Sequence, residues 1–78
     1  MPSIRREGPY RFFFYSSDQR EPPHVHVERD WKIAKFWLEP VRLQHSAGFR
    51  PSEIRKIMAI IMENEAVFVE AWNEYFDS

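Results

Sequence analysis

The strict alternation of apolar and polar residues in the segments HVHVE and KIAKFWLE constrains the fold more than any other feature of this 78-residue chain. In HVHVE, Val25 and Val27 face one side of an extended strand, whereas His24, His26 and Glu28 face the other. KIAKFWLE alternates in the same way. Because only a few residues separate the two segments, the pattern predicts an antiparallel hairpin with one apolar face.

The register of this hairpin follows from aligning its apolar residues. A turn around Asp30 and Trp31 places His24 opposite Trp37, and a slip of one residue would move one apolar set to the wrong face. Trp31 is poorly suited to a tight turn that needs a positive φ, so we expect a turn that is longer by one or two residues. In this register the apolar face consists of Val25, Val27, Ala34, Phe36 and Leu38.

The hairpin is flanked by segments of different character. The aromatic run RFFFYS before it predicts a strand, and SSDQREPP predicts a polar loop. We expect PVRLQHSAGF, which follows the hairpin, to begin with a short turn of helix. From Pro51 the apolar residues recur at helical spacing, and Glu63, Asn64 and Glu65 interrupt the stripe. We therefore expect two helices, although a single continuous helix would also keep the two stripes nearly in phase.

These elements predict one α+β domain over residues 1–78, mainly β over 1–44 and helical over 51–77. We expect a small antiparallel sheet of about three strands, with the two C-terminal helices packed on one face. The other face would then be open, and it would carry the two histidines. The chain contains no cysteine, which excludes disulfides and cysteine-based zinc sites.

Charge is divided unevenly along the chain, although the formal net charge is −1. Residues 1–50 hold nine Lys and Arg against six Asp and Glu (+3), and residues 51–78 hold two against six (−4). A balance of +3 does not by itself indicate nucleic-acid binding. No segment reaches the roughly 20 apolar residues of a membrane helix, and the N-terminus has no signal-like apolar run. We therefore expect a cytoplasmic protein without membrane contact.

Four segments, GPYRFFFYS, EPPHVHVERD, AKFWLEPV and EAWNEYF, resemble the bacterial family catalogued as domain of unknown function 4160. The resemblance covers nearly the whole chain. It implies a protein partner and no established activity, because members are often encoded beside a small protein of another uncharacterised family, domain of unknown function 2442. This arrangement implies a toxin–antitoxin-like pair. The shared motif residues are Pro22, Pro23, His24, His26 and, less strictly, Trp72.

A metal site is one interpretation of the two histidines. His24 and His26 leave the same face of a strand, so both imidazoles can bind one divalent ion such as Zn²⁺. A closed structural zinc site needs four protein ligands, and a catalytic one needs about three with a water. Further ligands would come from Glu28 on the same face, or from Glu21, Asp18 and His45 in loops. The motif alone is also typical of an ordinary sheet face, so we expect no cofactor, with zinc as the alternative.

Metal-independent cleavage of RNA is a second interpretation. His24 and His26 can act as general acid and base near neutral pH, and Lys35 can stabilise a phosphate. Tyr15 or Trp37 can stack on a base. Nothing in the sequence sets the distances between these groups, so whether the protein is an enzyme stays open.

Partner binding is the interpretation that we favour from the sequence. An open sheet face centred on Trp37 and Ile33 has the apolar centre and charged rim of a protein interface. Covering it would also stabilise a chain this short. The partner would be a small protein from a neighbouring gene or a second copy of the chain, and RNA is a further candidate. The residues expected at this surface are Trp37, Glu28, Ile33, Arg29 and Tyr15.

Overall fold

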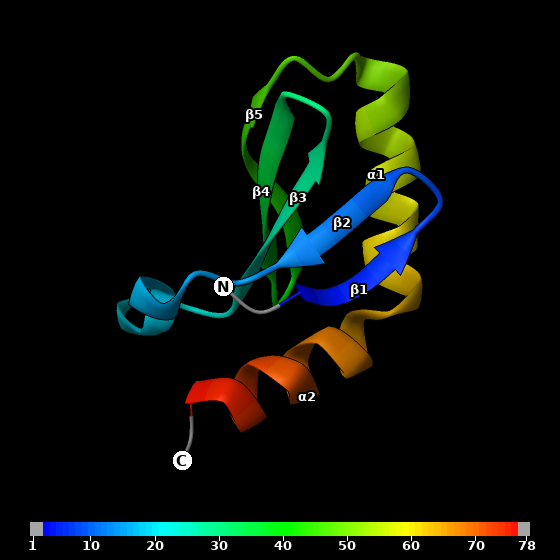
Figure 1. The fold of residues 1–78 in the computed structure, drawn as a ribbon. Coiled ribbons are helices and arrows are strands. Elements are labelled where there is room, and N and C mark those ends of the chain that lie inside the picture. The colour runs from blue at the N-terminus through cyan, green and yellow to red at the C-terminus, as the bar shows by residue number, and fades with distance from the viewer. Residues whose placement is uncertain (1–2, 77–78) are drawn as a thin grey trace.

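The computed structural model describes residues 3–76, which form a five-stranded antiparallel sheet and two α-helices (Figure 1). The strands lie side by side in the order of the sequence, so the sheet is a meander. The strands are β1 (Ser3–Glu7), β2 (Tyr10–Phe13), β3 (His24–Arg29), β4 (Lys32–Leu38) and β5 (Val41–Ala47). The helical elements are the 3₁₀ helix η1 (Ser16–Arg20) and the α-helices α1 (Pro51–Glu63) and α2 (Glu65–Phe76).

The central hairpin has the predicted register. His24 lies opposite Trp37, and the pairing continues without interruption to the turn. The turn contains only Asp30 and Trp31, so the prediction of a longer turn was wrong. Asp30 adopts the positive φ, at 56°, and Asp tolerates this conformation better than a bulky residue does. Trp31, the other turn residue, therefore does not need a positive φ.

The sheet has five strands rather than the expected three or so. The two additional strands, β1 and β5, lie at the edges, where a strand is exposed on more sides and need not alternate. β5 has the sequence VRLQHSA, and most of its residues are exposed or half-buried. The predicted helical turn at its start was therefore wrong, because edge pairing with β4 leaves little apolar signal for sequence analysis to detect.

The expected break between two helices is confirmed at Asn64. Its backbone N–H and its side-chain amide both donate to the carbonyl of Ile60, the side chain at 2.8 Å, and these bonds end α1. The chain then turns, so that α1 runs along the sheet and α2 crosses near its end (Figure 1). The predicted helical range extended to residue 77, which lies outside the described residues.

The core lies between the helices and the apolar face of the sheet. Phe12 of β2 packs against Phe68 of α2 with ring centroids 5.4 Å apart, and Phe14 meets Trp72 edge to face at 5.2 Å. The N-terminal turn of α1 is tied to the sheet by Glu53. Its carboxylate accepts hydrogen bonds from three side chains: Tyr10, Arg29 and Lys32.

Candidate functional site

The connection between β2 and β3 starts with Phe14 packed on Trp72 of α2 and then brings η1 against the start of β3. His24 and His26 point away from Val25 and Val27, which belong to the core, as the alternation predicted. The ring of His24 nevertheless lies 5.0 Å from that of Trp72 of α2. The expectation that the face is open was wrong at this position. His24 has 0% of its surface exposed and His26 has 9%. Alternation determines which way a side chain points, but it does not show that Asp18 and Trp72 come to lie against the two histidines.

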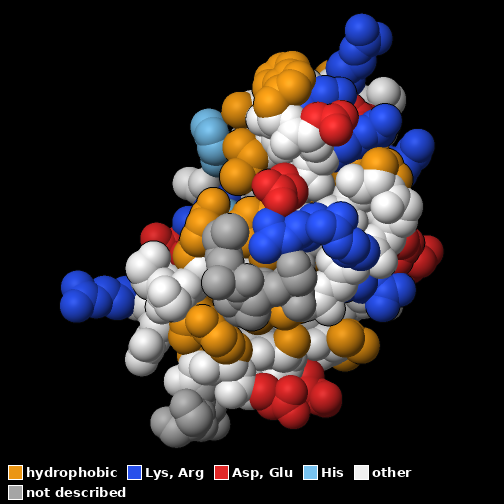
Figure 2. Space-filling view, viewed as in Figure 1, with side chains coloured by type: hydrophobic (Ala, Val, Ile, Leu, Met, Phe, Trp, Pro, Cys, Tyr) orange, Lys and Arg blue, Asp and Glu red, His pale blue; other side chains and the backbone are white. Residues whose placement is uncertain are grey.

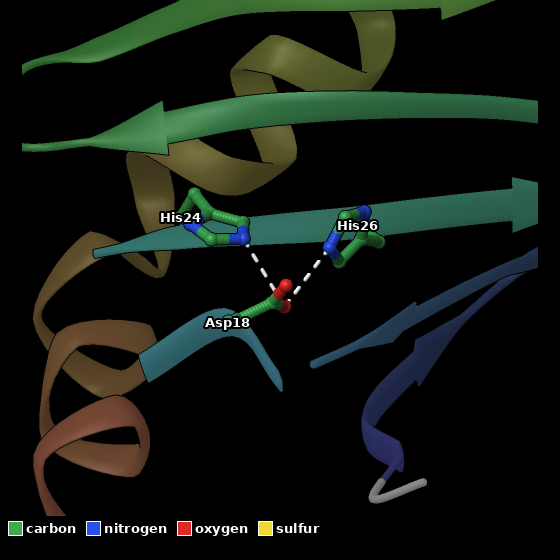
Figure 3. Close-up of side chains that lie close together, drawn as sticks. All are labelled: Asp18, His24 and His26. Carbon is green, nitrogen blue, oxygen red and sulfur yellow. Dashed lines mark hydrogen bonds and ion pairs between the residues drawn. The ribbon is translucent and has the colours of Figure 1, made fainter. Parts of the chain in front are cut away.

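Asp18 of η1 lies between the two imidazoles (Figure 3). Its Oδ2 atom lies 3.1 Å from Nε2 of His24 and 3.0 Å from Nε2 of His26. The same oxygen accepts a hydrogen bond from the backbone N–H of Tyr15 at 2.8 Å. This bond is typical of an acidic residue at the third position of a helix, which reaches back to the residue that caps the helix. One carboxylate thus shapes its own loop and joins that loop to β3. We call Asp18, His24 and His26 the Asp–His cluster.

His24 is held in one tautomer. Its Nδ1 lies 2.9 Å from the carbonyl oxygen of Pro22, and a carbonyl oxygen can only accept, so Nδ1 carries the proton. In the neutral ring, Nε2 then has only a lone pair. This atom is fully buried and has no hydrogen-bond partner among the described residues, although Asp18 Oδ2 is close. An atom with a lone pair therefore faces a carboxylate oxygen, an arrangement that a cation between them would relieve.

His26 is less constrained and slightly more accessible. Its Nε2 donates to Asp18, and its ring stacks on Phe13 with centroids 5.4 Å apart and meets Tyr15 edge-on at 4.6 Å. Burial lowers the pKa of His26 below its ordinary value, and the attraction of Asp18 opposes this shift. The ring is therefore neutral at neutral pH, which is the form that binds metals.

The Asp–His cluster can hold a positive charge in either of two ways. A proton on His24 Nε2 would make an ion pair with Asp18. A divalent ion bound to the three side chains would instead use both Nε2 atoms and the carboxylate. Ligands about 2.1 Å from one ion are about 3.0–3.4 Å from each other in octahedral or tetrahedral geometry. Both N···O distances in the cluster are at the lower end of this range, and all three ligand atoms lie within 4.8 Å of one another.

The other predicted site residues lie outside this cluster. Lys35 forms an ion pair with Glu21 and lies over the ring of Trp37, 4.9 Å from its centroid. Lys35 and Trp37 are therefore half-buried around the covering loop and are not the centre of an open patch. Of the loop candidates for metal ligands, Glu21 approaches Nδ1 of His24 at 3.9 Å, which is the nitrogen that already bonds Pro22. His45 is exposed on β5, opposite Lys35.

Of the remaining residues predicted for binding, Tyr15 contacts the cluster, whereas Glu28 and Arg29 have partners elsewhere. Glu28 bonds Arg11, and Arg29 bonds Glu53 near the start of α1. Tyr15 is 37% exposed and contacts His26, so it is the predicted binding residue at the edge of the cluster. Ile33 is half-buried on β4.

Asp18 was only one of several loop residues considered from the sequence. A sequence signal for it exists, because an acidic residue at the third position of a turn often bonds back to the chain. That signal locates the turn but not its distance from β3.

Comparison with known proteins identifies the family. No helix within residues 3–76 has the length and apolar character to cross a membrane. No curated protein and no solved structure matches the chain. The family model described as a domain of unknown function, DUF4160, matches residues 10–73, and this range includes the whole Asp–His cluster. The chain therefore belongs to this family.

Proposed function

We propose that this protein binds a divalent transition-metal ion through Asp18, His24 and His26. Solvent completes the coordination, since the cluster offers three ligands. Two imidazoles and one carboxylate suit first-row ions such as Zn²⁺ and Fe²⁺ better than Mg²⁺ or Ca²⁺, which prefer oxygen ligands only. An ion with three protein ligands and an open position is typical of reactive rather than purely structural sites.

The observation that supports this proposal is the buried, unpartnered Nε2 of His24. Burying a polar atom without a hydrogen bond destabilises a protein by about 1–3 kcal/mol, so such atoms are rare. Histidines that bind metals commonly donate their second N–H to a backbone carbonyl, which fixes the ring for coordination. His24 does this through Pro22, and its free nitrogen points at Asp18.

The three-dimensional arrangement supports acid–base cleavage of RNA less well. That hypothesis needs His24 and His26 to reach a substrate, and His24 has no exposed surface. The expected phosphate-binding Lys35 is already paired with Glu21. In this conformation the groups can hold an ion between them but cannot contact a polynucleotide together.

The test is direct titration of metal into protein purified without a histidine tag and treated with EDTA. We expect calorimetry with Zn²⁺ to show one site per chain, and Co²⁺ to give the visible absorption of a bound ion. Asp18→Asn, His24→Phe and His26→Phe should each weaken Zn²⁺ affinity by at least about a hundredfold, because each removes a direct ligand.

The third histidine of the chain supplies a matched control. His45→Phe removes an exposed imidazole outside the cluster and should leave the affinity for Zn²⁺ unchanged. Circular dichroism establishes that each variant is folded. The proposal is wrong if wild-type protein takes up no stoichiometric Zn²⁺ at micromolar concentrations, or if His45→Phe weakens binding as much as the cluster variants do.

A further inference from the structure

A groove of about 950 Å³ lies on the side of the molecule formed by the end of α1, the outer face of α2 and the β4–β5 turn. Its apolar floor includes Met62, Ala66 and Val69. Met62 is 59% exposed and lies beside the carboxylates of the groove. The groove shares no residue with the Asp–His cluster.

Five carboxylates line the groove: Glu39, Glu63, Glu65, Glu70 and Glu74. None of them forms an ion pair within residues 3–76, whereas the glutamates elsewhere in this range pair with Arg or Lys. No Lys or Arg occurs in the sequence after Lys56. Figure 2 shows acidic side chains with apolar neighbours at the lower end of the molecule, over α2, and basic side chains over other parts.

The two faces of α2 have separate roles. Phe68 and Trp72 face the core. Ala66, Val69 and Asn73 line the groove on another side of the helix, and they follow the spacing of a second stripe. Glu65 to Glu74 is a segment of ten residues, so its ends are about 14 Å apart along the helix axis. This length matches two to three turns of a helix laid alongside α2.

We infer that this groove docks an amphipathic helical segment of a different protein, with Lys or Arg on either side of an apolar stripe. The charge of the groove determines which side chains the partner carries. Unpaired carboxylates around an apolar floor favour cationic side chains and disfavour acidic ones. A second copy of this chain is a poor occupant. The only basic residues in its α-helices are Arg55 and Lys56, and the apolar stripe of their helix, with Ile57 and Ile61, is buried against its own sheet.

The probe is a fluorescein-labelled 14-residue peptide of Leu and Lys with Leu at helical spacing, measured by anisotropy in 150 mM NaCl and EDTA. Including EDTA makes the result independent of metal binding at the Asp–His cluster. We expect saturable 1:1 binding with a Kd below 100 µM, and amide shift changes confined to the groove. A peptide of the same composition with Leu and Lys alternating should bind at least tenfold more weakly, because it cannot present an apolar helical stripe.

Paired substitutions separate docking from general attraction between opposite charges. Glu70→Gln with Glu74→Gln should weaken binding of the helical peptide about fivefold, since each exposed ion pair contributes about 0.5 kcal/mol. Met62→Gln should weaken it as well, without any change of charge. Glu7→Gln with Asp30→Asn removes the same charge far from the groove and should change the Kd less than twofold.

Four results would overturn the inference. These are no saturable binding, equal binding of the alternating peptide, equal effects of the two neutralised pairs, and shift changes on another face. Light scattering tests whether a second copy of the chain occupies the groove instead. A dimer of the wild-type chain that Glu70→Gln with Glu74→Gln dissociates would assign the groove to a second copy and contradict docking of a different protein.

Discussion

Replacing His24 with an apolar residue should leave the metal-free protein as stable as the wild type or make it more stable. The ordinary expectation for a fully buried side chain is the reverse. The reason lies in the two nitrogens of His24, because only one of them has a hydrogen-bond partner within residues 3–76.

The magnitude follows from comparing these two atoms. His24→Phe removes the bond to the Pro22 carbonyl, a net loss of about 1 kcal/mol, and Pro22 is exposed enough for water to replace the donor. The same change removes a buried unpartnered nitrogen, which is worth about 1–3 kcal/mol. The net effect is between about 0 and 2 kcal/mol of added stability. In a domain of this size, each kcal/mol moves the Tm by about 4–8 °C.

His26→Phe provides the opposite case on the same strand. It removes a nitrogen that donates to Asp18 and leaves a mostly buried carboxylate short of one donor. We expect this variant to lose about 1–3 kcal/mol. The two histidines, two residues apart, should therefore respond with opposite signs.

The assay is urea denaturation in EDTA at pH 7.5, followed by circular dichroism, for the wild type and both variants. His24→Leu is measured beside His24→Phe, and the more stable of the two is used, because the larger ring can overpack the site. A loss above about 2 kcal/mol in both His24 variants would refute the reasoning.

Three further predictions concern the pH dependence of stability, Gly48 and Glu53. Burial lowers the pKa of His26 below its ordinary 6.5, so the unfolded chain binds more protons than the folded protein just below that pH. The free energy of unfolding in EDTA should therefore fall as the pH drops from 7.5 to 5.5. Urea titrations of His26→Phe should show a weaker dependence on pH. Gly48→Ala should destabilise by about 1–2 kcal/mol because Gly48 has φ 94°. The new Cβ would also lie 2.5 Å from a ring carbon of Trp31, so adding Trp31→Ala should recover only the steric part, as a double-mutant cycle will show. Glu53→Gln should lower the urea midpoint by weakening its bonds to Arg29 and two other side chains, and an unchanged midpoint would show that these contacts contribute nothing.

The central hairpin could be predicted from sequence because both faces of β3 and β4 carry a clear pattern. Val25 and Phe36 must share a face, and only one register allows this. The break at Asn64 could also be predicted from the sequence, because three polar residues interrupt an apolar stripe. The edge strands were not predicted, since β5 contacts the core on few positions and its side chains are mostly polar.

The candidate site was predicted only in part. Alternation correctly placed His24 and His26 side by side and facing away from Val25 and Val27, but it did not show that the ring of His24 lies 5.0 Å from that of Trp72 of α2. It could not show that they are buried, because their cover comes from Asp18 in a polar loop and, for His24, also from Trp72 of α2. A short polar loop has no periodicity from which its path can be predicted. The difference changes the chemistry, since buried imidazoles beside a carboxylate are suited to holding an ion rather than to contacting a large substrate.

The meander order of the strands also has a consequence for how the protein folds. Each strand pairs with its immediate neighbour in sequence, and such local topologies form quickly because little loop entropy opposes closure. All three ligands lie within a span of nine residues, from 18 to 26. The proposed ligands of the ion therefore need only the connection between β2 and β3 and the start of β3 to come together, while Trp72 of α2 completes the cover of His24.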